Sequence, residues 1–91
     1  MAEHRKEFTI VNRLGLHARA SAELVKLTNT FASRVTLSKG SMTVDGKSIL
    51  GIMSLAAGKG SEIMVHCEGS DCQEAINAIG DLIKNCFGEG E

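Results

Sequence analysis

The chain has no tryptophan, tyrosine or proline, and only three of its 91 residues are phenylalanine. So few aromatic side chains argue against a surface on which nucleic-acid bases stack. The net charge of −1 provides neither a basic field for nucleic acid nor an acidic tail. No apolar run approaches the roughly 18 residues of a membrane span, and the N-terminal MAEHRKE lacks the apolar core of a signal peptide. We therefore expect a cytoplasmic protein that binds no nucleic acid and is not inserted in a membrane.

The three cysteines argue against a disulfide framework and give only a weak indication of a metal site. Cys67, Cys72 and Cys86 are an odd number without C-x-x-C spacing, which argues against a disulfide framework. His66 beside Cys67 hints at a metal site. However, Cys67 continues the alternation of a strand and Cys86 continues the apolar face of a helix, so both are better explained as small buried hydrophobes. We expect no metal and no cofactor.

The remaining residues are those of an ordinary small globular protein, with 43% apolar side chains. We expect one domain over residues 1–91. Alternating apolar residues predict strands at 6–12, 33–38, 42–44 and 62–67, the middle two forming a hairpin. Helical spacing predicts a helix from 18 to about 29–31 and a last one that carries the apolar residues from 75 to 86 before a frayed FGEGE end. A short helix over 47–55 is favoured by the length of that apolar segment, although Gly51 weakens this prediction. Ser48 and either Ser70 or Asp71 are candidate caps for the second and third helices.

This order, β-α-β-β-α-β-α, predicts an α+β protein in which one face of a four-stranded, most likely antiparallel sheet is covered by helices.

Residues 12–22, NRLGLHARASA, contain the most informative stretch of the chain. Gly15 stands where a strand must turn into the first helix, and His17 and Arg19 lie at or near its N-terminus. That end carries a partial positive charge, which disfavours cations, and it lacks the usual Ser, Thr, Asp or Asn cap. The arrangement is explained if an anion binds there, because backbone N–H groups and an arginine fork both bind anions. Such departures from local rules are typical of functional sites.

Two strings about 30 residues apart, GLHAR at 15–19 and KSILGIMSL at 47–55, resemble the HPr family of histidine-containing phosphocarriers of the bacterial phosphotransferase system. The likeness extends over nearly the whole chain. It implies an open-faced β-sandwich with four antiparallel strands covered on one face by three helices. It also implies that His17 accepts a phosphoryl group on Nδ1 from enzyme I and passes it to IIA domains, with Arg19 as the charge partner of the phosphate.

The chemistry of His17 agrees with that implication. A positive helix end disfavours the protonated ring, which leaves a lone pair to attack phosphorus. The same backbone N–H groups would then stabilise the new phosphoryl dianion. The transfer needs mainly in-line positioning and charge stabilisation, much of it supplied by the partner. No second catalytic group or substrate pocket is visible, so we expect a relay protein and not a stand-alone enzyme.

The second string has regulatory and docking implications. The resemblance implies that Ser48 is phosphorylated by an HPr kinase/phosphorylase, which is compatible with plain capping of the helix. Ile49, Leu50 and Met53 present more apolar surface than one side of a short helix can bury. The family suggests that part of this set docks partners, in contacts that are small and transient. We expect a monomer.

Ala20 is the one departure from the family pattern, which usually has proline after the arginine. Proline suits the first turn of a helix, but alanine removes no chemical group from the site. The circuit therefore stays open between a sugar-transport carrier and a nitrogen-type, NPr-like regulatory carrier, although the KSILG string favours the former. A small binding module for RNA or a metal is the alternative from another class, and the sequence has none of the features that it predicts.

Overall fold

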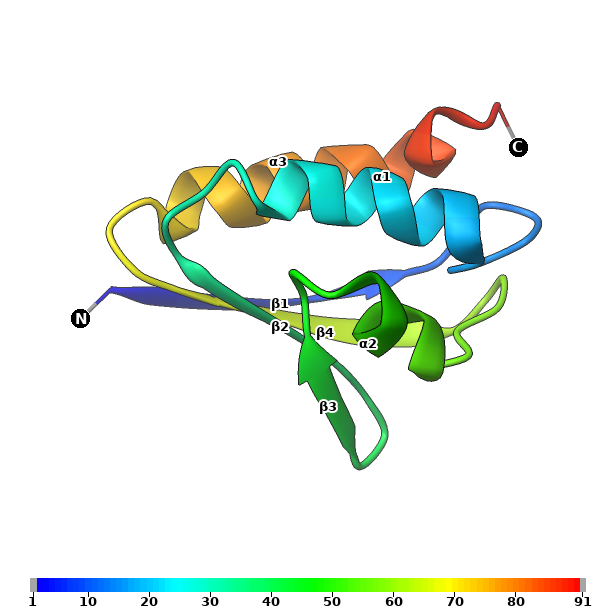
Figure 1. Ribbon diagram of the computed structural model, residues 1–91, viewed down its shortest axis with the longest axis horizontal. Coiled ribbons are helices and arrows are strands. Elements are labelled where there is room, and N and C mark those ends of the chain that lie inside the picture. Colours follow the sequence, from blue (N-terminus) through cyan, green and yellow to red (C-terminus); the bar gives the residue numbers. More distant parts are fainter. Residues whose placement is uncertain (1, 91) are drawn as a thin grey trace.

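The computed structural model describes residues 2–90, which fold into a sheet layer and a helix layer (Figure 1). The elements follow the predicted order: β1 (Glu3–Thr9), α1 (Ala18–Thr28), β2 (Arg34–Lys39), β3 (Met42–Asp45), α2 (Ile49–Ser54), β4 (Glu62–Glu68) and α3 (Cys72–Lys84), with a short 3₁₀ turn η1 (Cys86–Gly88) at the end. The predicted fold class, an open-faced sandwich with a four-stranded antiparallel sheet and three helices, is confirmed.

The four strands are ordered β1-β4-β2-β3, and every neighbouring pair is antiparallel. β4 lies between β1 and β2, with Ile63 opposite Phe8 and Val65 opposite Leu37. Because side chains alternate along a strand, Ile63, Val65 and Cys67 are all buried while the residues between them are partly exposed. One face of the sheet therefore contributes the core, as expected for an antiparallel sheet covered on one side.

The helices complete this core from above the sheet. α1 buries Ala20 and Leu24, and α3 buries one apolar stripe along its length. α2 packs against α1 and β3 near one edge of the layer (Figure 1). The α3 stripe consists of Cys72, Ala75, Ile76, Ile79 and Ile83. Within residues 2–90 no helix is both long and apolar enough to cross a membrane.

Two elements, β1 and α2, have other bounds in the structure than the sequence indicated. β1 runs over Glu3–Thr9 and not over 6–12, because pairing with β4 extends back to Glu3 opposite Glu68. Its outer residues face solvent, so charged side chains are tolerated where the alternation alone indicated no strand. α2 begins at Ile49 and not at 47, because Ser48 precedes it as the cap: its Oγ accepts from the Gly51 N–H at 3.1 Å.

The prediction that a Ser70 or Asp71 side chain caps α3 was wrong. Asp71 precedes the helix, but its side chain makes no cap hydrogen bond. The carboxylate instead accepts from the Ser33 hydroxyl and from the backbone N–H groups of Ala32 and Ser33, at 2.8 and 2.9 Å. These bonds, the hydroxyl first, hold the pKa of Asp71 below its ordinary value. Asp71 thus ties the turn before α3 to the connection between α1 and β2.

The end of the chain also differs from the prediction, which had it fray after a helix through Cys86. α3 ends at Lys84, Cys86 is only half-buried, and the Phe87 side chain is 3% exposed. Cys86 and Phe87 adopt left-handed backbone conformations, with φ of 54° and 55°. Each costs about 1–2 kcal/mol, and burial of a phenylalanine ring, worth about 1.5–3 kcal/mol, offsets much of that. This anchored turn carries the following residue, Glu89, towards the start of α1.

Candidate functional site

The loop between β1 and α1 is held in place by a backbone hydrogen bond to the loop before β4 and by one buried side chain. Gly15 adopts a φ of +67°, and the next N–H, that of Leu16, donates to the Ala57 carbonyl at 2.8 Å. A Cβ on Gly15 would lie 2.4 Å from that same oxygen. The buried Asn12 side chain donates to the Gly15 carbonyl at 2.8 Å. Glycine is required here, and the loop that presents His17 is consequently well defined.

His17 immediately precedes α1, and this helix start has no side-chain cap and no acidic residue in its first turn. The first intrahelical bond runs from the Ser21 N–H to the His17 carbonyl at 2.9 Å. The backbone N–H groups of residues 18–20 come before that bond, so they are the unsatisfied donors of the helix. The expected uncapped, positive helix end is therefore present, with the imidazole beside it.

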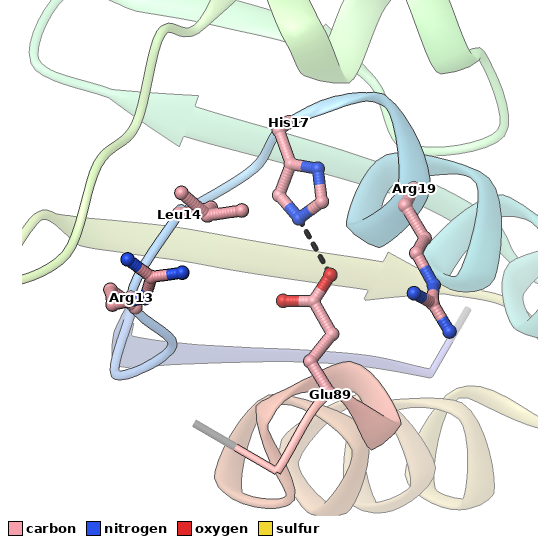
Figure 2. A pocket seen from close by; sticks show the side chains of 5 residues that line it. All are labelled: Arg13, Leu14, His17, Arg19 and Glu89. Carbon is pink, nitrogen blue, oxygen red and sulfur yellow. Dashed lines mark hydrogen bonds and ion pairs between the residues drawn. The ribbon is translucent and has the colours of Figure 1, made fainter.

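Glu89 is the contact that sequence reasoning missed. Its Oε2 lies 2.6 Å from Nε2 of His17 (Figure 2). Its Oε1 accepts from the Asn12 side-chain amide at 2.9 Å. Burial raises the pKa of Glu89, but the bonds from Asn12 and His17 and the charges of His17 and Arg19 outweigh it, so that the pKa lies below its usual range. The carboxylate is therefore ionised at neutral pH.

A pocket of about 180 Å³ opens beside this pair. Figure 2 shows five side chains around it, from the β1–α1 loop, from the start of α1 and from the C-terminal turn. These are Arg13, Leu14, His17, Arg19 and Glu89. The structure thus brings His17 and Arg19, both expected at or near the start of the first helix, to one pocket, and adds a second arginine. Two arginines and the helix end supply positive charge at this pocket, and the ionised Glu89 supplies one negative charge.

The α2 residues are exposed to different extents. The exposed fractions are 40% for Ile49, 80% for Leu50 and 38% for Met53, whereas Ile52 is fully buried. Leu14, on the rim of the pocket, is 58% exposed and was not singled out by the sequence. Its position in a turn gives no periodic pattern to mark it. Apolar side chains are thus exposed both beside His17 and on α2.

His66 lies in different surroundings, on the sheet. His66 contacts Glu3 on the neighbouring strand, with 3.3 Å between Nε2 and Oε1. Cys67 points to the opposite face, into the core, so the adjacent pair His66 and Cys67 cannot bind one ion together. No group of three or more metal-binding side chains occurs within residues 2–90.

These features define the class: a small α+β protein that presents a histidine at an uncapped helix start, beside two arginines and a carboxylate. The sequence model of the family described as "PTS HPr component phosphorylation site" matches residues 4–85. The phosphocarrier protein HPr of Cupriavidus necator is 52% identical over 96% of this chain and 98% of that protein. The HPr of Pseudomonas aeruginosa is 48% identical over 93% of this chain and 96% of that protein.

Solved structures agree. A crystal structure of HPr-C-His from Thermoanaerobacter tengcongensis matches with a TM-score of 0.91 and 41% identity, over 94% of this chain and 97% of that one. HPr from Bacillus anthracis matches with a TM-score of 0.87 and 40% identity, over 91% and 99%. The chain belongs to the HPr family of phosphocarrier proteins, whose members are components of the phosphotransferase system.

Proposed function

We propose that this protein accepts a phosphoryl group from enzyme I on Nδ1 of His17 and passes it to IIA domains in the cytoplasm. The observation that carries the proposal is the placement of His17 at an uncapped helix start, beside a pocket lined by two arginines. A neutral imidazole is a good nucleophile there, and the N–H groups of residues 18–20 can bind the oxygens of the transferred group. The family description supports the same role.

Arg19 is proposed as the charge partner of the phosphoryl group. Its guanidinium lines the pocket with His17, and a planar fork suits phosphate oxygens better than an ammonium group. Catalysis of phosphoryl transfer depends mostly on positioning and on electrostatic stabilisation. A carrier needs only part of this machinery, because each partner protein supplies the rest.

We further propose that partners dock on Ile49, Leu50 and Met53, in a small and transient interface with a monomeric carrier. Ser48, at the start of α2 beside these residues, is the proposed site of regulatory phosphorylation by an HPr kinase/phosphorylase. A phosphate there would add close to two negative charges next to the docking surface. It would also replace the hydroxyl that now accepts from the Gly51 N–H. We expect it to weaken acceptance of a second phosphoryl group.

The proposal is tested by following radiolabelled phosphate through both steps of the relay. The wild-type protein, enzyme I, phosphoenolpyruvate and Mg²⁺ should yield a labelled carrier, and addition of a IIA domain should remove the label from it. His17→Ala should take up no label, whereas His66→Ala should behave as wild type because His66 lies on the sheet. Labelling of His17→Ala would contradict the proposal.

The same experiment distinguishes the two circuits. A carrier of the sugar system discharges to a sugar-specific IIA domain faster than to a nitrogen-type IIA domain. The reverse preference would identify an NPr-like regulatory carrier. Either result keeps His17 as the acceptor and changes only the partner.

A further inference from the structure

The His17–Glu89 contact determines which ring nitrogen carries the proton. An ionised carboxylate only accepts hydrogen bonds, so a ring nitrogen 2.6 Å from Oε2 must donate. A neutral imidazole has one N–H, and here that N–H is on Nε2. The other nitrogen, Nδ1, then holds a free lone pair. Figure 2 shows Nε2 pointing at Glu89 and Nδ1 on the side of the ring towards α1.

We propose that Glu89 is a positioning residue that holds His17 in the Nε2–H tautomer and so makes Nδ1 the nucleophile. The inference rests on the proposed function, because it explains how the acceptor nitrogen is selected. Glu89 touches no transferred atom. It acts through His17, in the way that the aspartate of a serine-protease triad orients its histidine and stabilises the imidazolium that forms.

Asn12 makes this role specific for a carboxylate, because the group beside His17 must accept a hydrogen bond on each of two oxygens. Its side-chain amide is fully buried and donates both to the Gly15 carbonyl and to Oε1 of Glu89. Oε1 is thus committed to Asn12, and only Oε2 is left for the histidine. The buried Phe87, two residues earlier, anchors the segment on the core. The carboxylate is held from both sides, as an orienting group must be.

The position of the carboxylate also argues against a simpler interpretation, in which Glu89 occupies the phosphoryl site and must leave. Glu89 contacts Nε2, on the side of the ring away from Nδ1 (Figure 2). A phosphoryl group on Nδ1 would face the N–H groups of α1, so the carboxylate and the phosphoryl group need not compete.

The transfer step balances with this arrangement. The Nδ1 lone pair attacks phosphorus and the Nδ1–P bond forms. The bond between phosphorus and the donor group of enzyme I breaks, and its electron pair stays on that donor atom. No proton leaves His17: it stays on Nε2, and the positive charge that develops on the ring faces the negative Glu89. Transfer to a IIA domain reverses these steps.

Glu89→Gln offers a sharp test because the geometry predicts an inversion. Asn12 would hold the amide oxygen of the glutamine, so the amide nitrogen would face His17. The ring would then have to accept at Nε2, which moves its proton to Nδ1 and blocks the nucleophile. Long-range ¹H–¹⁵N NMR of histidine-labelled protein at about pH 8.5, where free imidazole is neutral, reports the tautomer directly. We expect Nε2–H in the wild type and a shift towards Nδ1–H in the variant.

Kinetics should follow the tautomer. The rate of phosphoryl acceptance from enzyme I should fall roughly 10- to 100-fold in Glu89→Gln. This is less than the ~10⁴-fold loss for a buried triad aspartate, because the pair here is partly open to solvent. Glu89→Ala, which imposes neither tautomer, should give a mixture and an intermediate rate. Glu3→Gln is the matched control, since it alters the remote pair with His66 and should change neither the His17 tautomer nor the rate.

The outcomes separate this inference from the function on which it rests. An Nδ1–H tautomer in the wild type, or the same tautomer in the wild type and Glu89→Gln, would overturn the role of Glu89 even if His17 is phosphorylated normally. A slower Glu89→Gln with an unchanged tautomer would overturn it too, because a merely structural tether predicts that result. Failure of enzyme I to phosphorylate the wild type would instead refute the proposed function, and the NMR result would still show whether Glu89 sets the tautomer.

Discussion

At the scale of single residues, the position of His17 depends on the backbone of Gly15. A side chain there meets two separate obstacles: the left-handed φ of +67° and the Ala57 carbonyl 2.4 Å from where its Cβ would lie. Gly40, in the β2–β3 turn, has a similar φ of +60° but open space around it. The two glycines therefore separate the conformational cost from the steric cost.

Gly15→Ala should lower the free energy of unfolding by at least about 2–3 kcal/mol, and Gly40→Ala by only about 1 kcal/mol. Chemical denaturation of both variants measures the difference. Gly15→Ala should also slow phosphoryl acceptance, since the loop that presents His17 must shift away from Ala57. Equal losses of stability in the two variants would show that the contact with Ala57 does not constrain the loop.

Cys67 predicts a dependence of stability on alkaline pH. Burial, followed by the nearby Cys72 and Asp71, raises the pKa of its thiol from 9.0 to about 11. A raised acid pKa means that the folded state favours the neutral thiol, so its contribution is complete below pH 9 and is lost as the pH rises from 9 towards 11. The loss is at most about 3 kcal/mol, at roughly 1.4 kcal/mol per pKa unit.

Cys67→Val, which cannot ionise, should retain more of its stability between pH 9 and 11 than the wild type. Denaturation midpoints measured across that range test this. Cys86→Val is the control, because Cys86 is only half-buried. Parallel pH profiles for the wild type and Cys67→Val would contradict the account of the buried thiol.

At the scale of elements, α2 combines a packing role with the proposed docking role in six residues. Ile52 is fully buried in the core, while Leu50 is 80% exposed. Helical geometry separates the two side chains, so the two roles can be altered independently. The sequence showed an excess of apolar residues in this segment, but only the packing of α2 on α1 and β3 determines which of them are buried.

Leu50→Ser should therefore leave the free energy of unfolding within about 0.5 kcal/mol of the wild type and raise the KM of enzyme I for the carrier. Ile52→Ala should cost about 2–5 kcal/mol with little effect on KM while the protein stays folded. Denaturation and steady-state phosphorylation of both variants test the assignment. An unchanged KM for Leu50→Ser would exclude Leu50 from the docking surface.

The elements also show where sequence reasoning is sufficient. Hydrophobic periodicity and the turn residues predicted the order of strands and helices. The uncapped start of α1 pointed to His17 and Arg19. Asn12 and Glu89 were not found, because Glu89 is 72 residues from His17 in sequence and follows a turn with no periodic pattern. The start of β1 was missed for a related reason: its strand conformation comes from pairing with β4.

At the scale of the whole molecule, the packing of the helix layer on the sheet brings together the start of α1 and the turn after α3. The sheet supports α1 and α3 side by side (Figure 1), and this places the turn after α3 beside the start of α1. The histidine, its carboxylate and two arginines therefore meet at one end of the helix layer. A partly exposed site of this kind suits the proposed carrier, which would have to engage and release its partners quickly.

The central claim, that His17 carries the phosphoryl group, is tested most directly by intact mass spectrometry. The wild type, His17→Ala and His66→Ala are each incubated with enzyme I, phosphoenolpyruvate and Mg²⁺. We predict that the wild type and His66→Ala gain the mass of one phosphoryl group, which is lost in acid as expected of a phosphohistidine, and that His17→Ala gains nothing. An acid-labile gain on His17→Ala, or no gain on the wild type with an enzyme I that phosphorylates the Cupriavidus necator relative, would contradict the account.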